Sequence, residues 1–270
     1  MRIAILGGDA RMPYAARALE ERGHEVTLSA HGETPLSPEA LSHAEAVLLP
    51  MPLSRDGVYL NAPLSPLPVP LSPLFAMLPD GIPLLVGKED GILRTLSGEH
   101  PILPYGTGED FRRRNSQATA EGALFLLMQR LTATLADTPC LLLGSGHLAA
   151  SLLDLLGGLH SPVTVFARNP APIGEGIRPL PLGALPAEIS RYPVILNTVP
   201  VRLLDAPLLR RCAKGTLLLE LSAVKGVLDE TAAREAGITV VTAPALPGRY
   251  APESAGRAIA DAVAGILPTA

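Results

Sequence analysis

The sequence has few cysteines, a modest share of charged residues and no long apolar run, and each shortage excludes a class of protein. Its two cysteines, Cys140 and Cys212, lack the spacing of a metal site or a redox pair. We therefore expect buried reduced thiols, no bound metal and a cytoplasmic protein. The net charge of -4 at pH 7 argues against a nucleic-acid partner. The sequence has no run of about 18 apolar residues, so we expect no membrane span. A strand beginning near Arg2 leaves no room for a signal peptide, so none is expected.

Histidine is missing from the last 110 residues, because the final one is His160. Dehydrogenases of 2-hydroxy acids need a histidine acid/base in the C-terminal part of the cofactor domain, close to the nicotinamide. The absence disfavours a ketone–alcohol hydride transfer that uses such a residue.

Two short apolar strands each run into glycines and then into a helical segment. They are the Ile3–Asp9 and Leu141–His147 segments. Such starts are typical of doubly wound α/β units, because the glycines let a phosphate approach backbone N–H groups at a helix N-terminus. A chain of 270 residues has the length of about two domains. We therefore expect two Rossmann-like domains with parallel sheets and a cleft between them. Residues 1–113 would form the substrate domain and residues 114–270 the NAD(P)-binding domain.

Apolar runs alternate with helical periodicity along both halves, as parallel sheets with right-handed crossovers require. Strands are expected at Ile3–Leu6, Val26–Leu28, Val47–Leu49, Pro83–Val86, Cys140–Leu143, Val163–Ala167, Val194–Asn197, Thr216–Leu221 and Thr239–Thr242. Helices are expected at Tyr14–Glu21, Pro38–Ala44, Leu148–Leu156 and Ala255–Ile266, with a joining helix from about Phe111 to Leu135. The prolines of Asn61–Pro73 predict an extended loop, because proline has no N–H to donate.

The second glycine turn has the better dinucleotide fingerprint. Gly144 would make the tight turn, Gly146 would admit the pyrophosphate, and Ala149 would allow close helix–strand packing. The remaining residues of the turn complete the predicted cofactor contacts, and they are Ser145, His147 and Leu148.

The end of the following strand indicates which cofactor the turn binds. NAD sites usually place Asp or Glu there for the ribose 2′-hydroxyl. This chain has no carboxylate between residues 163 and 171, whereas Arg168 could bind a 2′-phosphate through charge-assisted hydrogen bonds. The sequence therefore favours NADP and leaves NAD possible. The alternative is an exposed arginine without a ligand.

Two later strand ends add candidate cofactor contacts. Asn197, Thr198, Val199 and Pro200 follow one strand, and Ser222 follows another. Carboxyl ends of parallel strands face the ligand crevice of an open α/β sheet, so Asn or Thr could contact the ribose or the nicotinamide. A purely structural turn is the alternative.

Candidate substrate contacts lie in the first half and at the start of the joining helix. Arg11 follows the Gly-Gly-Asp turn and has the planar geometry that suits a carboxylate. Ser54, Asn115 and Thr119 could add polar contacts, and Glu121 could serve as a general base. Capping and solvation are the competing interpretations for each of them.

Several segments together resemble the family of dipicolinate synthase A subunits of spore-forming bacteria. The most specific are the GGDAR start and the LPG…AP…AG tail. The matching segments are Ile3–Arg11, Asn115-Ser116 with Thr119 and Glu121-Gly122, Gly144–Gly146, Asn197–Pro200, and Ala243–Gly248 with Ala251-Pro252 and Ala255-Gly256.

The resemblance implies a reaction, a cofactor and a partner. Members of this family oxidise dihydrodipicolinate, which derives from the diaminopimelate (lysine) pathway, to dipicolinate, and hydride passes to NADP. The resemblance implies a cytoplasmic enzyme of the sporulating mother cell, whose partner is the flavoprotein-like B subunit of dipicolinate synthase. It also implies that Arg11, Ser54 and the Asn115–Thr119 segment hold the two carboxylates of the substrate. A homo-oligomer is expected.

Two alternatives stay open at this point. A shikimate-dehydrogenase-like enzyme would pair a Lys and an Asp in its first domain, but Lys88 is the single lysine of this half and its spacing to Asp90 is wrong. An NADP-binding scaffold that needs its B partner for activity is the other alternative. It is favoured by the scarcity of obvious acid/base residues.

Overall fold

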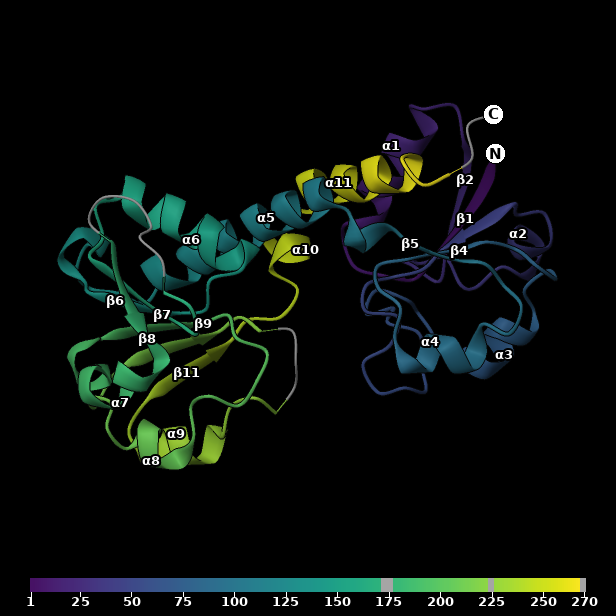
Figure 1. The fold of residues 1–270 in the computed structure, drawn as a ribbon. Helices are drawn as coiled ribbons and strands as arrows, with labels where there is room; N and C mark the ends of the chain where they lie inside the picture. The colour runs from purple at the N-terminus through teal and green to yellow at the C-terminus, as the bar shows by residue number, and fades with distance from the viewer. Residues whose placement is uncertain (171–176, 223–225, 268–270) are drawn as a thin grey trace. The chain divides into compact units, whose positions relative to one another are not determined.

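The chain folds into two compact α/β units. The structure is a computed structural model, which describes residues 1–170, 177–222 and 226–267 (Figure 1). Unit 1 comprises Met1–Asn115 and Pro247–Ala270, and unit 2 comprises Ser116–Leu246. Each unit has a parallel sheet with helices on its faces, as the sequence predicts.

Unit 1 has the strand order β2-β1-β3-β4-β5, with each neighbouring pair parallel. Its strands are β1 Arg2–Leu6, β2 Glu25–Ser29, β3 Ala46–Leu48, β4 Leu84–Val86 and β5 Ile102–Pro104. Its helices are α1 Met12–Glu20, α2 Pro38–Ser42, α3 Leu71–Ala76, α4 Gly91–Leu96 and α11 Pro252–Ala264, with a 3₁₀ turn η1 at Tyr105–Thr107. Helix α5, Glu109–Met128, begins in unit 1 and ends in unit 2, and α10, Leu246–Tyr250, begins in unit 2 and ends in unit 1.

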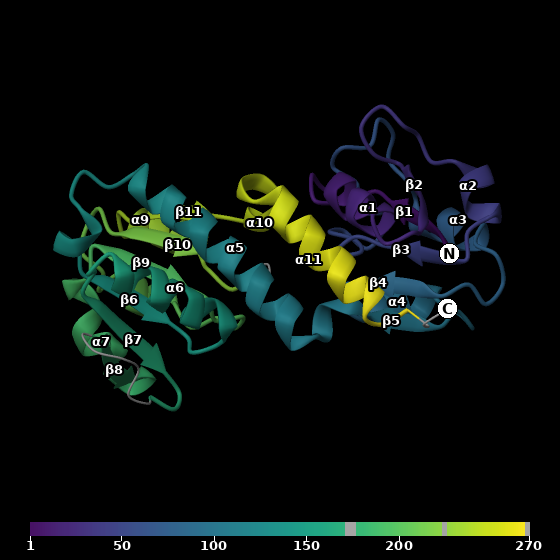
Figure 2. The ribbon, with the colours of Figure 1, turned by 90° about the horizontal axis from the view of Figure 1, so that it is seen from above.

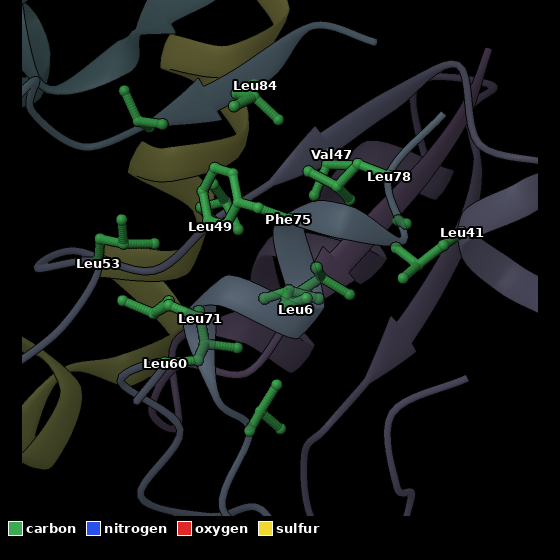
Figure 3. Packing of buried hydrophobic residues seen from close by; sticks show 14 of the residues in the cluster. Leu6, Leu41, Val47, Leu49, Leu53, Leu60, Leu71, Phe75, Leu78 and Leu84 are labelled. Atoms are coloured by element: carbon green, nitrogen blue, oxygen red, sulfur yellow. The ribbon is translucent and has the colours of Figure 1, made fainter. Parts of the chain in front are cut away.

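Alternation along the strands gives the unit 1 sheet two apolar faces. Ile3 and Ile5 of β1 pack in a cluster with α1 and α11, whereas Leu6 packs in the opposite cluster with α2, α3 and α4. Figure 3 shows the second cluster, where Phe75 and Leu71 of α3 lie against the sheet residues. Because both faces are covered, the strands are near-continuous apolar runs, which is typical of a parallel sheet.

Helix α11 packs side by side with α1, although the two are far apart in the sequence (Figures 1 and 2). Ile259 and Val263 of α11 are fully buried in the cluster that contains Met12 and Leu19 of α1. The expected limits 1–113 and 114–270 therefore need a correction. The last segment of the chain, from Pro247, belongs with the first unit because its apolar face completes that unit's core.

Unit 2 has the strand order β11-β10-β9-β6-β7-β8, again with parallel neighbours. Its strands are β6 Cys140–Leu143, β7 Val163–Ala167, β8 Ile177–Pro181, β9 Val194–Asn197, β10 Leu217–Glu220 and β11 Thr239–Thr242. Its helices are α6 His147–Gly158, α7 Leu185–Glu188, α8 Ala206–Leu209 and α9 Glu230–Glu235, with 3₁₀ turns η2 Leu135–Asp137, η3 Leu182–Ala184 and η4 Ile189–Arg191. Figure 1 shows α6 on one face of the sheet and α7, α8 and α9 on the other.

Two predicted segments end differently from expectation. The joining helix stops at Met128 instead of continuing to Leu135. Leu135 belongs to a separate 3₁₀ turn, which Thr134 caps by accepting a hydrogen bond from the Asp137 N–H. The proline-rich loop ends at Pro70, and the remaining residues to Pro73 start helix α3. Proline is tolerated in the first turn of a helix, where its missing N–H has no partner to lose.

Both cysteines are free and buried, as predicted. Burial raises the pKa of the Cys212 thiol from 9.0 to about 11 and raises that of Cys140 as well. Since the thiolate is the reactive form, two pKa units lower its fraction about 100-fold near pH 8. We expect the Cys212 thiol of the native protein to react with a disulfide reagent at pH 8 about 100-fold more slowly than after unfolding in guanidinium, and the Cys140 thiol to react more slowly as well. A fast native phase that disappears in a Cys212→Ser variant would contradict this.

Among the described residues, no helix is both long and apolar enough to cross a membrane. The same part of the chain contains no cluster of three His, Cys, Asp or Glu side chains that could hold a metal ion.

Candidate functional site

Each sheet has one point where the strand order reverses. In unit 2 the first strand, β6, lies between β7 and β9, which is the Rossmann order with its switch point between β6 and β9. In unit 1 the order is that of flavodoxin-like sheets, with the switch point between β1 and β3. Open α/β sheets bind ligands outside the carboxyl ends of the strands at such points, so these two edges are the places to examine.

The Gly144 turn of unit 2 has the backbone that a dinucleotide requires. Gly144 adopts a φ of +109°, and a Cβ on it would lie 2.4 Å from Thr198 Oγ1. Its N–H donates to the Phe166 carbonyl at 2.9 Å, which ties the turn to β7. A Cβ on Gly146, in contrast, would meet nothing within 4 Å. Gly144 is therefore required by the fold itself, and the space beside Gly146 is open for a ligand.

Helix α6 begins at this turn with an uncapped N-terminus. Gly146 is the N-cap residue, and no side chain caps the helix. Ser145, Gly146 and His147 are exposed, Leu148 is half-buried and Ala149 is fully buried. Exposed N–H groups at a helix start form a favourable site for an anion. The turn therefore fits the pyrophosphate of a dinucleotide.

Arg168 lies directly after β7, on the strand neighbouring the glycine turn. Its side chain is exposed and forms no ion pair within residues 1–170, 177–222 and 226–267. The position is the one that carries an acid in NAD sites. The structure thus places a cation where the sequence predicts it.

Asn197 and Thr198 use their polar groups inside the protein. Thr198 Oγ1 donates to the Leu143 carbonyl at 2.7 Å, which joins the ends of β9 and β6 across the switch point. Asn197 is buried and donates from Nδ2 to Glu220 Oε2 at 2.7 Å, while its Oδ1 accepts from the Val199 N–H at 3.1 Å. These two side chains shape the edge of the sheet. Thr198 and Val199 are half-buried, and Pro200 is exposed.

Ser222 has an orphaned polar atom. Its Oγ is buried and has no hydrogen-bond partner in the described part of the chain, whereas its N–H donates to Glu220 Oε1 at 2.9 Å. A buried hydroxyl without a partner is costly, so a bound group that accepts or donates there would be stabilised. This supports Ser222 as a cofactor contact.

The predicted substrate contact Arg11 is itself held by two protein groups at the unit 1 switch point. Its Nε and Nη2 donate to the two carboxylate oxygens of Asp9 at 2.8 and 3.0 Å, and Nη2 also donates to the Met51 carbonyl at 3.2 Å. The arginine is only 4% exposed. Nη1 is the guanidinium nitrogen that no described residue engages. Arg11 therefore has one direction left in which to meet a ligand.

Tyr105 is buried close enough to this ion pair for both charges to act on its phenol. Its ring packs edge-on against Phe111 at 5.5 Å between centroids, and its hydroxyl donates to the Leu49 carbonyl at 3.4 Å. Burial raises the pKa of Tyr105 to about 12, which the positive charge of Arg11 partly opposes. The phenol therefore stays neutral beside this ion pair.

Ser54 shapes the loop after β3. The serine is buried, and its hydroxyl donates to the Tyr59 carbonyl at 2.6 Å while accepting from the Gly57 N–H at 2.9 Å. A hydroxyl has one proton, so this bond leaves none for a substrate carboxylate.

Asn61 ties the same loop to the first glycine turn. Its carbonyl accepts from the Gly8 N–H at 2.9 Å, and its side chain donates to the Pro52 carbonyl at 3.0 Å. Its Oδ1 accepts from Arg55 Nε at 3.0 Å. Asn61 therefore orients the exposed guanidinium of Arg55 at the edge of unit 1.

The remaining candidates lie along α5. Asn115 is the last residue of unit 1 and Thr119 lies in unit 2, and both are half-buried. Glu121 is exposed and accepts a hydrogen bond from Gln117 Nε2 at 2.9 Å. The structure assigns no chemistry to these three side chains, so their roles stay predictions.

Two polar residues that lie at the carboxyl edges of the two sheets were not identified from the sequence. Asn61 lies within the proline-rich stretch that predicts only a loop. Glu220 ends an otherwise leucine strand, and a lone carboxylate after three leucines was the available signal. Its parallel partner in register is Asn197, which no local pattern could reveal.

The two sheets and the glycine turn define a two-unit α/β protein with the dehydrogenase type of Rossmann fold. The structure of a D-lactate dehydrogenase with NAD+ from Lactobacillus jensenii aligns with a TM-score of 0.59 at 10% identity, over 98% of this chain and 95% of its own. At that identity the likeness shows the fold.

Within this class the chain resembles one family closely. Residues 2–102 match the family model of the N-terminal domain of the dipicolinate synthase A subunit. The dipicolinate synthase A subunit of Bacillus subtilis (strain 168) is 24% identical over 284 residues, which cover 99% of this chain and 96% of that protein. The crystal structure of the A subunit from Bacillus halodurans matches with a TM-score of 0.87 at 24% identity, over 99% of this chain and 98% of that chain. The resemblance to dipicolinate synthase A subunits that the motifs predict is confirmed.

Proposed function

We propose that this chain is an NADP-dependent oxidoreductase that converts dihydrodipicolinate to dipicolinate. The observation that carries the proposal is the likeness to dipicolinate synthase A subunits along nearly the whole chain. In this reaction the dihydropyridine ring loses a hydride and a proton and becomes aromatic. The nicotinamide accepts the hydride. Because aromaticity supplies much of the driving force, the protein has chiefly to orient the ring and to hold its two carboxylates.

The absence of a histidine beyond His160 supports this reaction over that of the D-lactate dehydrogenase neighbour. A ketone–alcohol interconversion moves a proton on and off oxygen, for which that class uses a histidine acid/base. Aromatisation needs a base for one ring proton only. In this proposal Glu121 is the candidate base, because it is exposed and carries a carboxylate.

In unit 2 the cofactor would lie across the switch point. The backbone N–H groups of the glycine turn and of the first turn of α6 would hold the pyrophosphate. Ser222 Oγ would gain a hydrogen-bond partner from the cofactor. In unit 1, Arg11 through Nη1 and the Asn61-tethered Arg55 are the cations that would bind the substrate's carboxylates. Asn115 and Thr119 remain candidates for a second set of contacts.

Arg168 is expected to decide between the two nicotinamide cofactors. An Arg168→Ser variant should lose about 10- to 100-fold in affinity for NADP+, because a charge-assisted pair with the 2′-phosphate disappears. Its affinity for NAD+ should change less than about twofold. Titration calorimetry with both cofactors measures this, and Arg211→Ser, which replaces another exposed arginine of unit 2, is the matched control. Equal losses for both cofactors would show that Arg168 does not read the 2′-phosphate.

The reaction itself is tested by ultraviolet absorbance of dipicolinate. The purified chain is mixed with NADP+ and freshly prepared cyclic intermediate of the diaminopimelate pathway, beside controls without enzyme and with NAD+. We expect a rise that requires both the chain and NADP+. A rise that appears only after addition of the B subunit would favour a partner-dependent enzyme, and no rise in either case would reject the proposed reaction.

A further inference from the structure

The ends of β9 and β10 are joined by a buried carboxylate. Glu220 is the last residue of β10 and pairs in parallel register with Asn197, the last residue of β9. Glu220 is 6% exposed and Asn197 is 2% exposed. Oε2 of the glutamate accepts from Asn197 Nδ2 at 2.7 Å, and Oε1 accepts from the Ser222 N–H at 2.9 Å. Each oxygen of the carboxyl group thus accepts a hydrogen bond from a nitrogen donor of a different residue.

Glu220 is the one charged residue of a strand that is otherwise made of leucines. Leu217, Leu218 and Leu219 precede it, and all three are buried. A buried carboxylate is less favourable than an apolar side chain at such a position unless its bonds are needed elsewhere. Glu220 holds the starts of two loops. It accepts hydrogen bonds from the side-chain amide of Asn197, at the end of β9, and from the backbone N–H of Ser222, which follows β10.

The place of this pair in the sheet indicates what the loops serve. A Rossmann sheet consists of two mononucleotide-binding halves, and a dinucleotide lies across both. The glycine turn and Arg168 belong to the half formed by β6, β7 and β8. Glu220, Asn197 and Ser222 belong to the half formed by β9, β10 and β11. The first half of the sheet carries the predicted contacts to the pyrophosphate and the 2′-phosphate. The second half is therefore the one expected to bind the nicotinamide nucleoside.

We propose that Glu220 is a positioning residue for the nicotinamide half of the cofactor. This inference rests on the proposed function of unit 2 in binding a nicotinamide dinucleotide. Glu220 acts through Asn197 and Ser222. The Asn197 amide, held at Nδ2 by the carboxylate, turns its Oδ1 to the Val199 N–H and thereby sets the path of the Val199-Pro200 loop. The bond to the Ser222 N–H orients the residue whose Oγ has no partner among the described residues.

The inference predicts that Glu220→Gln separates the two halves of the ligand. Asn197 Nδ2 and the Ser222 N–H donate to different oxygens of the carboxylate, so in a glutamine one of these two donors would face the NH2 group instead of an acceptor. Affinity for NADP+ should fall about tenfold, whereas affinity for 2′,5′-ADP, which contains only the adenosine side, should change less than about twofold. Glu235→Gln, at an exposed position on α9, is the matched control and should leave both affinities unchanged.

A charge-swapped double variant distinguishes positioning from a general loss of structure. In Asn197→Asp/Glu220→Gln, the glutamine amide at 220 donates to the aspartate at 197, and the acceptors for the Val199 and Ser222 N–H groups are kept. All three hydrogen bonds are restored, while the negative charge moves from 220 to 197. We expect the double variant to recover NADP+ affinity to within about threefold of the wild type.

Calorimetric titration of the full chain with NADP+, NAD+, 2′,5′-ADP and ADP gives the decisive comparison. A loss of NADP+ and NAD+ affinity in Glu220→Gln that leaves the 2′,5′-ADP and ADP affinities unchanged, and that the double variant reverses, supports the inference. Unchanged NADP+ affinity in Glu220→Gln, or no recovery in a folded double variant, overturns it while leaving the proposed function intact. If the wild-type chain binds neither dinucleotide, the proposed function of unit 2 fails and this inference fails with it.

Discussion

Replacing Gly144 with alanine is expected to lower the affinity for NADP+ at least about 100-fold, equivalent to about 2.7 kcal/mol. A Cβ at this position would lie 2.4 Å from Thr198 Oγ1, and the backbone has a φ of +109° that L-residues rarely adopt. The Thr198 side chain cannot simply rotate away without losing its 2.7 Å hydrogen bond to the Leu143 carbonyl. The turn must therefore change shape, and the N–H groups that follow it lose their orientation toward a phosphate.

Gly146→Ala is the control that separates the two glycines of the turn. A Cβ there would meet nothing in the protein within 4 Å, and the residue has an ordinary φ of -85°. Without cofactor, this variant should melt within about 2 °C of the wild type, because its folded state gains no clash, and the cost of alanine at the N-cap is offset by the lower entropy of its unfolded chain. Gly144→Ala should melt several degrees lower, since strain of a few kcal/mol shifts the midpoint by that much. Differential scanning calorimetry of both variants measures this.

With cofactor, both variants are expected to bind poorly, but for different reasons. The methyl group added in Gly146→Ala occupies the space through which the pyrophosphate approaches, whereas the one added in Gly144→Ala distorts the turn itself. A Gly144→Ala protein that binds NADP+ as the wild type does would show that the cofactor does not use this turn. Wild-type affinity in Gly146→Ala would place the pyrophosphate elsewhere along the α6 N-terminus.

Strands with a strong apolar signal were predictable from the sequence. Cys140–Leu143, Val163–Ala167 and Val194–Asn197 were predicted with the bounds that the structure shows. Such strands are buried in a parallel sheet, so hydrophobicity and length alone identify them. β8 was missed because two prolines interrupt its five residues, and it pairs with β7 alone among the described strands. Proline is tolerated at an edge, but it removes the pattern on which prediction relies.

The sequence predicted which residues lie at the candidate site, but it did not predict which groups their side chains bind. Strand order placed Gly144, Arg168, Asn197 and Ser222 at one edge of a sheet, as the motifs predict. Residue type did not reveal what each polar group binds. Asn197 is paired with a carboxylate 23 positions further along the chain. A pairing of this kind is decided by the register of two parallel strands, and a single sequence carries no local signal for it.

The two most specific motifs of the family resemblance meet in the interior of unit 1. Asp9 of the GGDAR start lies so close to Gly248 of the tail that a Cβ there would be 2.6 Å from its carboxylate oxygen. Gly256, also in the tail, lies against the backbone of α1. The residues of these two motifs therefore form a packing interface between segments from the two ends of the chain. That interface also explains why the last segment belongs to unit 1 and not to unit 2.

Substitution of Gly256 by valine is expected to destabilise unit 1 by about 3 kcal/mol, at the upper end of the usual cost of overpacking. A Cβ at this position would lie 2.4 Å from the Arg11 carbonyl oxygen, 2.7 Å from Tyr14 Cβ and 3.0 Å from the Ala15 nitrogen. Two of these neighbours are backbone atoms of α1 and cannot rotate aside. The helices would have to separate, which opens the cluster that contains Met12 and Ile259.

The measurement is the unfolding transition of unit 1 by calorimetry, which should move down by about 10 °C. Gly265→Ala, at the C-cap of the same helix, is the matched control, since a Cβ there makes contacts at the ordinary distance of 3.6 Å. The binding of NADP+ to unit 2 should survive the Gly256 substitution at temperatures where unit 1 remains folded, because no residue of the predicted cofactor set lies in unit 1. An unshifted transition would mean that α1 and α11 are not in close contact. That result would return the C-terminal helix to the second unit, where the sequence alone had placed it.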